Sequence, residues 1–137
     1  MKDGLIDIII PAYKAQETII RTLSSIAMQT IVDKLDVTIV NDAYGYYTEY
    51  IEMFRKYFPI KEIILTENGG AGVARQKGID ITEHEYFTCI DADDTFASAI
   101  ALETLLEGIK ANEAIKCCSV SFMQLGDDLQ HLVPHQN

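Results

Sequence analysis

The sequence is poor in cysteine and in basic residues, and it contains no long apolar run. Its three cysteines are odd in number, and Cys117 and Cys118 are adjacent, so the sequence predicts no disulfide framework. We therefore expect reduced thiols and a cytoplasmic protein. No apolar run approaches the ~20 residues that span a bilayer, so we expect no membrane span. The net charge of −10 argues against nucleic acid as a partner, because phosphates require a basic face.

The chain does contain enough apolar material for the core of one domain, with 48% apolar residues in 137. Buried strand-like runs alternate with segments of helical periodicity. The strands are predicted at residues 5–10, 35–40, 63–65, 86–90 and 115–123. The helices are predicted at residues 16–29, 47–58, 70–81 and 98–111. This alternation predicts an α/β fold of three layers, with a mostly parallel sheet between helices in a Rossmann-like arrangement.

In such a sheet, ligands bind beyond the carboxyl ends of the strands. The predicted strand ends carry most of the unusual polar residues of the sequence. They are followed by the sequences Pro11-Ala12-Tyr13, Asn41-Asp42, Thr66-Glu67-Asn68 and Asp91-Ala92-Asp93-Asp94. We expect these groups to meet at one rim of the sheet.

The acidic sequence from Asp91 to Asp94 directly follows an apolar strand. Adjacent carboxylates repel one another, and a bound cation removes that repulsion. Mg²⁺ or Mn²⁺, held by one or two of these carboxylates and by nucleotide phosphates, fits this pattern. The alternative is a solvated acidic turn in which Asp94 or Ser98 caps the next helix.

A glycine-rich turn, Asn68-Gly69-Gly70-Ala71-Gly72, opens the third predicted helix. Such a turn brings the backbone close to a ligand and directs N–H groups at an anion. Arg75 lies early in the same helix and is within reach of a phosphate. A tight turn that packs a helix closely on the sheet is the alternative. Asp42, taken alone, fits either a contact to a base N–H or a turn.

Taken together and in order, these motifs resemble family 2 glycosyltransferases of the GT-A type. The sequence Ile8-Ile9-Ile10-Pro11-Ala12-Tyr13 is similar to the family's opening strand, and Val40-Asn41-Asp42 to its second-strand Asp motif. Residues 68–75 match its N-x-G-x-(A/G)-x-A-R pattern, and Asp91-Ala92-Asp93 matches its D-x-D motif. The resemblance extends from Ile6 to about Phe122.

The resemblance implies a donor domain that binds a nucleotide-diphosphate sugar, with UDP as the expected nucleotide, for transfer of the sugar to an acceptor. It places Pro11 and Tyr13 beside the nucleoside, Asp42 at the base, Arg75 at the base or diphosphate, and Asp91 at the ribose. The complete nucleotide-binding set is Pro11, Ala12, Tyr13, Asp42, Asn68, Arg75, Asp91 and Ala92. Asp93 is the implied ligand of Mn²⁺ or Mg²⁺, which acts as a Lewis acid on the leaving diphosphate.

The sequence also departs from the family pattern. Lys14 stands where Asn is usual, and Ala43-Tyr44 replaces Gly-Ser after the second-strand Asp. Residues 1–137 are expected to form one donor-binding domain that is incomplete at its C-terminus, because no residue is identified as the catalytic base. The acceptor and the oligomeric state are left open.

Two alternatives remain from the sequence. One is a non-catalytic or partner-dependent fragment that binds a nucleotide sugar without transferring the sugar. The other is a haloacid-dehalogenase-like phosphatase, since Asp91 to Thr95 has that family's D-x-D-x-T form with Asp91 as nucleophile. Only two lysines, Lys110 and Lys116, follow this motif. The phosphatase reading also leaves Asp42 and the glycine turn unexplained.

Overall fold

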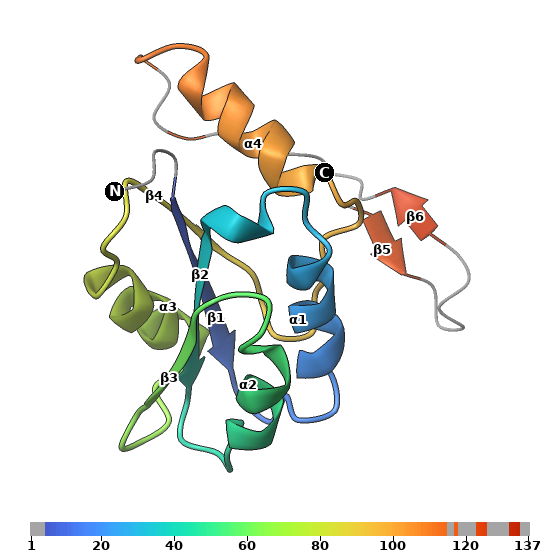
Figure 1. The fold of residues 1–137 in the computed structure, drawn as a ribbon. Helices are drawn as coiled ribbons and strands as arrows, with labels where there is room; N and C mark the ends of the chain where they lie inside the picture. Colours follow the sequence, from blue (N-terminus) through green and yellow to red (C-terminus); the bar gives the residue numbers. More distant parts are fainter. Residues whose placement is uncertain (1–4, 115–116, 118–122, 126–131, 135–137) are drawn as a thin grey trace.

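The computed structural model describes residues 5–114, 117, 123–125 and 132–134. Helices and strands alternate along the chain (Figure 1). The strands are β1 (Ile6–Ala12), β2 (Leu35–Asn41), β3 (Ile60–Ile64), β4 (Tyr86–Cys89), β5 (Met123–Leu125) and β6 (Leu132–Pro134). The helices are α1 (Ile19–Ala27), the short 3₁₀ turn η1 (Val32–Lys34), α2 (Thr48–Phe54), α3 (Ala71–Asp80) and α4 (Ala101–Lys110).

The main sheet has four parallel strands in the order β3-β2-β1-β4. The chain moves outward from β1 to β2 and β3, and then crosses back to add β4 on the other side of β1. This reversal creates a topological switch point between the carboxyl ends of β1 and β4, where ligands bind in open α/β sheets. β5 and β6 form a separate antiparallel pair.

Alternating side chains of β1 face two different helical layers, which explains its continuous apolar sequence. Ile8 and Ile10 belong to the large core cluster with residues of α1, α2 and α4. Ile9 belongs to a second cluster with Val40 and Ala74 of α3. Figure 1 shows α1 and α2 on one side of the sheet and α3 on the other. The predicted three-layer α/β fold with a parallel sheet is therefore confirmed.

Helix α3 lies very close to the sheet because Gly78 has no side chain. A Cβ atom built on Gly78 would lie 2.3 Å from Cγ2 of Ile9, a separation that no real contact shows. The close packing places the start of α3 above the end of β1. This close packing comes from Gly78 and not from the glycine-rich turn, since a Cβ atom added at Gly70 or Gly72 would meet nothing within 4 Å.

Several element boundaries differ from the prediction. β1 continues through Pro11 to Ala12, and this is possible because β4 pairs with β1 only as far as Ile9. β3 begins at Ile60, three residues before the predicted start. It is an edge strand with exposed positions, so charged residues interrupt the apolar run that the prediction relied on. The predicted strand at 115–123 lies almost wholly outside the described residues, and its last residue begins β5.

Among the described residues, no helix has the length and apolar content needed to cross a membrane.

Candidate functional site

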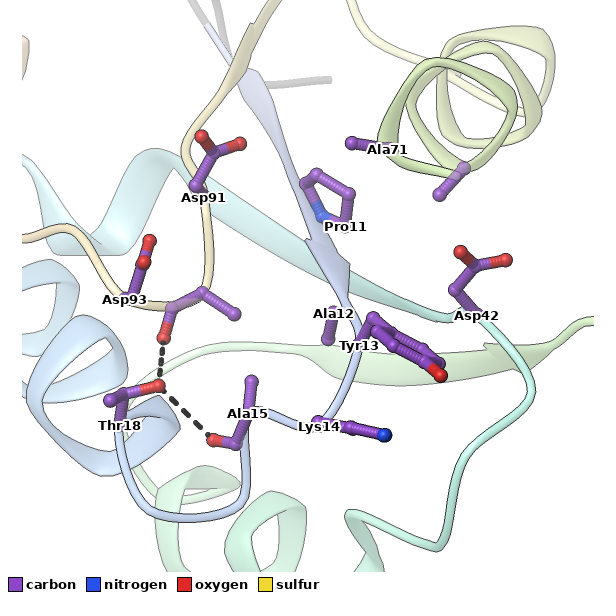
Figure 2. A pocket seen from close by; sticks show the side chains of 12 residues that line it. Pro11, Ala12, Tyr13, Lys14, Ala15, Thr18, Asp42, Ala71, Asp91 and Asp93 are labelled. Atoms are coloured by element: carbon purple, nitrogen blue, oxygen red, sulfur yellow. Dashed lines mark hydrogen bonds between the residues drawn. The ribbon is translucent and has the colours of Figure 1, made fainter. Parts of the chain in front are cut away.

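A cavity of about 360 Å³ lies at the switch point, beyond the carboxyl ends of β1 and β4. Figure 2 shows Asp42 on one side of it, Asp91 and Asp93 on the other, and Pro11 between them. The lining residues come from the β1–α1 connection, the end of β2, the start of α3 and the acidic loop. They are Pro11, Ala12, Tyr13, Lys14, Ala15, Thr18, Asp42, Ala71, Ala74, Asp91, Ala92 and Asp93.

Most of the residues that the sequence nominates line this cavity. The exceptions are Asn68 and Arg75, each of which contacts a lining residue, Asp42 and Asp91 respectively. The prediction missed five lining residues, namely Lys14, Ala15, Thr18, Ala71 and Ala74. The switch-point geometry explains all five, because they lie just after β1 or in the first turns of α3.

Asp42 is 2% exposed, and its carboxylate holds the glycine turn in place. Oδ1 accepts a hydrogen bond from the main-chain N–H of Gly69 at 2.8 Å. Oδ2 accepts from the main-chain N–H of Gly70 at 2.9 Å and from the side-chain amide of Asn68 at 3.1 Å. Gly70 has φ of 89°, a conformation that glycine adopts without strain. The end of β2 is thereby bound to the start of α3.

This arrangement changes one expectation from the sequence. The glycine turn was expected to present N–H groups to an external anion, but those of Gly69 and Gly70 already donate to the carboxylate of Asp42. The anion that these N–H groups bind at the start of α3 is therefore the carboxylate of Asp42. Asp42 still lines the cavity. Its carboxylate can accept a hydrogen bond from a ligand only through lone pairs that the three hydrogen bonds to the turn do not use.

Arg75 and Asp91 form an ion pair between α3 and the end of β4. Nη2 of Arg75 lies 2.8 Å from Oδ1 of Asp91, and the two side chains are 40% and 46% exposed. The charge-assisted hydrogen bond to Asp91 raises the pKa of Arg75 above its usual value. The pair fixes the first carboxylate of the acidic loop and leaves part of it accessible from the cavity.

The acidic loop brings three carboxylates together. One oxygen each of Asp91, Asp93 and Asp94 lie within 4.8 Å of one another. The N–H of Asp94 donates to the carbonyl of Asp91 at 3.0 Å, which closes the turn. Burial, followed by the negative charges of Asp93 and Asp91, raises the pKa of Asp94. The loop therefore concentrates negative charge on oxygen donors, the ligand type that Mg²⁺ and Mn²⁺ prefer.

One face of α1 and the turns that flank it hold this loop by its main chain. We call the residues Thr18, Thr22, Ser25 and Gln29 the polar stripe. Thr18 Oγ1 lies 2.9 Å from the carbonyl oxygen of Ala92, and Thr22 Oγ1 donates to the carbonyl of Asp94 at 2.7 Å. Ser25 Oγ accepts from the N–H of Phe96 at 3.1 Å. Thr22 and Ser25 lie in α1, whereas Thr18 occupies its N-cap position and Gln29 follows its end.

Gln29 completes the stripe and corrects a prediction about α4. Its Oε1 accepts from the N–H of Leu102 at 3.0 Å, and its Nε2 donates to the carbonyl of Ser98 at 2.8 Å. Helix α4 begins at Ala101, so Ser98 is not its N-cap, and the hydroxyl of Ser98 instead accepts from the N–H of Ile100. The capping of α4 is long-range, which no local motif predicts.

Two of the departures from the family pattern, Lys14 and Tyr44, lie side by side, and Lys14 lines the cavity. Nζ of Lys14 lies 5.3 Å from the ring centroids of both Tyr13 and Tyr44, and the two rings meet edge to face at 5.8 Å. Lys14 and Ala43 have φ values of 53° and 65°, in the left-handed region that disfavours non-glycine residues.

The side chain of Asn41 fixes the loop that follows β2. It accepts from the N–H of Tyr44 at 3.0 Å and donates to the carbonyl of Gly45 at 2.9 Å. The same amide donates to the carboxylate of Glu62 at 2.9 Å. These contacts hold Ala43 in its strained conformation and place the ring of Tyr44 beside Tyr13.

Comparison with known proteins agrees with this geometry. The sequence model described as "Glycosyl transferase family 2" matches residues 7–135. This chain belongs to glycosyltransferase family 2. The acidic loop, the glycine turn and the second-strand Asp therefore lie in a family 2 domain, as their resemblance implied. The match also sets aside the haloacid-dehalogenase-like phosphatase alternative.

Two curated relatives are similar over nearly the whole chain. The amylovoran biosynthesis glycosyltransferase AmsB of Erwinia amylovora is 33% identical over 95% of this chain and 46% of its own length. The cholesterol galactosyltransferase of Borreliella burgdorferi is 26% identical over 96% of this chain and 37% of its own. The chain thus spans less than half the length of either relative.

Solved structures show the same fold. The crystal structure of S. aureus TarS residues 1–349 has a TM-score of 0.72 and 25% identity, covering 80% of this chain and 33% of its own. The mannosyltransferase PcManGT from Pyrobaculum calidifontis has a TM-score of 0.67 and 21% identity, covering 74% and 31%. The four-stranded sheet of this family 2 chain is therefore the GT-A arrangement that the sequence predicts.

Proposed function

We propose that this chain is the donor-binding part of a glycosyltransferase, which binds a nucleotide-diphosphate sugar together with a divalent cation for transfer of the sugar to an acceptor. The observation that carries the proposal is the meeting of two arrangements at one cavity. On one side Asp42 holds the glycine turn, and on the other Asp91, Asp93 and Asp94 converge. Family membership makes sugar transfer the reaction class that this site serves.

The cavity suggests where each part of the donor binds. The nucleoside fits along Pro11, Ala12 and Tyr13, whose exposed ring offers an apolar face for a base. Asp42 lies at the same end of the cavity, where its carboxylate holds the glycine turn. Asp91, with Arg75 attached, faces the ribose and the first phosphate, and Ala92 lies beside it.

Asp93 is the proposed ligand of Mn²⁺ or Mg²⁺, with Asp94 close enough to contribute a second oxygen. The fit rests on donor chemistry, since three carboxylate oxygens converge and burial with like charge opposes ionisation of Asp94. When bound, such a cation stabilises the departing diphosphate as a Lewis acid. Thr18 and Thr22 orient the loop through its carbonyls, which keeps the carboxylates directed into the cavity.

Structural relatives support the donor class and leave its identity open. TarS is known in complex with UDP-GlcNAc and with UDP, and PcManGT in complex with GDP-Man and Mn²⁺. We propose UDP as the nucleotide of this chain and leave the sugar unassigned. The cytoplasmic location that the cysteines suggest stays a prediction.

We further propose that residues 1–137 act as one donor-binding domain whose acceptor site and catalytic base come from outside the residues described. The relatives are more than twice as long, and no described residue is assigned as the base. The second candidate is a domain that binds the donor but depends on a partner for transfer. Transfer assays on the purified 137-residue chain, alone and with added cell extract as a source of partner proteins, separate the two.

The test of donor binding is a calorimetric titration with UDP and GDP in Mn²⁺, in Mg²⁺ and in EDTA. We expect measurable UDP binding only with the cation, because the net charge of −10 repels a diphosphate. Asp93→Ala should remove the dependence on the cation. Glu107→Ala, which removes an exposed carboxylate on α4, is the charge-matched control and should keep it. Equal UDP affinity in EDTA and in Mn²⁺ contradicts the proposal.

A further inference from the structure

A second group of metal-binding side chains lies on the sheet, near the amino ends of its strands. Asp7 of β1 and Asp36 of β2 are register partners on adjacent parallel strands, so their side chains point to the same face. His84 comes from the connection between α3 and β4, two residues before β4 begins. One ligand atom of each residue lies within 4.8 Å of the others.

Asp7 and His84 are sheltered, Asp36 is partly exposed, and hydrogen bonds hold the three side chains in place. Asp7 is 8% exposed, and the side chains of His84 and Asp36 are 16% and 39% exposed. Oδ2 of Asp7 accepts from the N–H groups of Glu83 and His84 at 3.0 and 2.9 Å. Nε2 of His84 is in hydrogen-bond contact with Oδ2 of Asp36. Ligand carboxylates in metal sites are oriented by main-chain N–H groups in this way.

The group of Asp7, Asp36 and His84 differs from an ordinary ion pair in its excess of negative charge. Two carboxylates lie side by side, and one imidazole is the group that faces them. In the part of the chain that the structure describes, neither Asp7 nor Asp36 forms an ion pair with a lysine or an arginine. An excess of negative charge on a sheltered sheet face is a setting that a divalent cation stabilises.

We propose that Asp7, Asp36 and His84 form a zinc site, separate from the nucleotide cavity, that fastens the α3–β4 connection to β1 and β2. One imidazole with two carboxylates is a donor set that suits Zn²⁺ better than Mg²⁺ or Mn²⁺. Zn²⁺ at about 2.0–2.2 Å from each ligand atom would take the place of the hydrogen that joins His84 to Asp36. The exposed side of Asp36 leaves the fourth position to water.

The test is calorimetric titration of the full chain with Zn²⁺ in the Asp93→Ala background, which weakens the acidic loop as a competing site. We expect one site that survives in the His131→Ala/His135→Ala double variant, which removes the other two histidines of the sequence. Asp36→Asn and His84→Ala should each weaken Zn²⁺ binding by at least about tenfold.

His84→Gln serves if His84→Ala does not fold, because the glutamine amide can still donate to Asp36. A folded His84→Gln variant that binds Zn²⁺ as tightly as its parent overturns the proposal. So does a loss of the site in the His131→Ala/His135→Ala variant with Asp36→Asn unaffected. Neither result bears on UDP binding, which is measured with Mn²⁺ at the other end of the sheet.

Discussion

The hydroxyl of Thr18 lies 2.9 Å from the carbonyl oxygen of Ala92, a residue 74 positions later in the sequence. This contact joins the turn that enters α1 to the middle of the acidic loop, between Asp91 and Asp93. Thr18 contacts the main chain of the loop and none of the described carboxylates, so it affects the site by orienting the loop. Thr18 is therefore a positioning residue for the proposed cation site.

Replacing Thr18 by valine keeps the volume of the side chain and removes the hydroxyl. A hydrogen bond of this kind contributes about 0.5–1.5 kcal/mol, so we expect Thr18→Val to weaken Mn²⁺-dependent UDP binding by about 2–10-fold. Calorimetry gives the affinity in Mn²⁺. Ser24→Ala removes a neighbouring α1 hydroxyl outside the polar stripe and should leave the affinity unchanged. The same weakening in both variants argues against a positioning role.

Asp42→Asn tests whether the carboxylate holds the glycine turn. An amide presents one acceptor oxygen, whereas Gly69 and Gly70 donate to separate oxygens of Asp42. One part-buried N–H group then faces an NH₂ group, and we expect the free energy of unfolding to fall by about 1 kcal/mol. Urea denaturation measures the change. Asn68→Ala removes the side-chain hydrogen bonds to Oδ2 of Asp42 at 3.1 Å and to its carbonyl oxygen at 3.3 Å, but it leaves both N–H groups of the turn paired, so it should cost less. An equal or larger loss for Asn68→Ala contradicts this assignment.

Gly78→Ala and Gly72→Ala are a matched pair within α3. The added methyl group at Gly78 would lie 2.3 Å from Ile9, so we expect a loss of stability of about 1–3 kcal/mol. At Gly72 an added Cβ meets nothing within 4 Å, and the higher helix propensity of alanine should stabilise the fold by up to about 1 kcal/mol. Thermal or urea unfolding compares them. Equal effects mean that α3 does not pack on Ile9 as described.

Cys89 should react slowly with alkylating reagents. Burial raises the pKa of its thiol, the positive charge of Arg75 opposes this, and Asp91 adds to it. Because the thiolate is the reactive form, a raised pKa lowers the reactive fraction at pH 8 and shifts the rise in rate to higher pH. Cys117 is exposed. Mass spectrometry of tryptic peptides after timed iodoacetamide treatment measures both rates, and faster alkylation of Cys89 than of Cys117 contradicts the burial.

Patterns local in sequence predicted the sheet and the rim of the cavity. The isoleucine run of β1 predicts a strand that is buried on both faces. Asp91 comes directly after Ile90, the apolar residue that follows β4. Parallel topology then brings strand ends together without further information. The residues Pro11, Asp42 and Asp91 were found in this way.

The contacts that the sequence did not predict are long-range ones. A serine before an apolar periodic segment favours a cap at Ser98, yet Gln29, in the turn after α1, pairs with the N-terminus of α4. Glycines before a helix favour an external anion, yet Asp42 reaches them from a separate strand. In both cases a side chain distant in sequence replaced the partner that local rules expect.

In the hydrogen bonds that the described residues form, the polar stripe meets the acidic loop and the segment just after it through main-chain groups, namely two carbonyl oxygens and the N–H of Phe96. Every amino acid except proline carries both of these groups. The support that the polar stripe gives therefore does not depend on the side chains at Asp93 and Asp94. Substitutions at Asp93 or Asp94 can alter which ligand is preferred while the framework beneath stays the same. Evolution and protein engineering can thus change the chemistry of this loop one residue at a time, without first rebuilding its support.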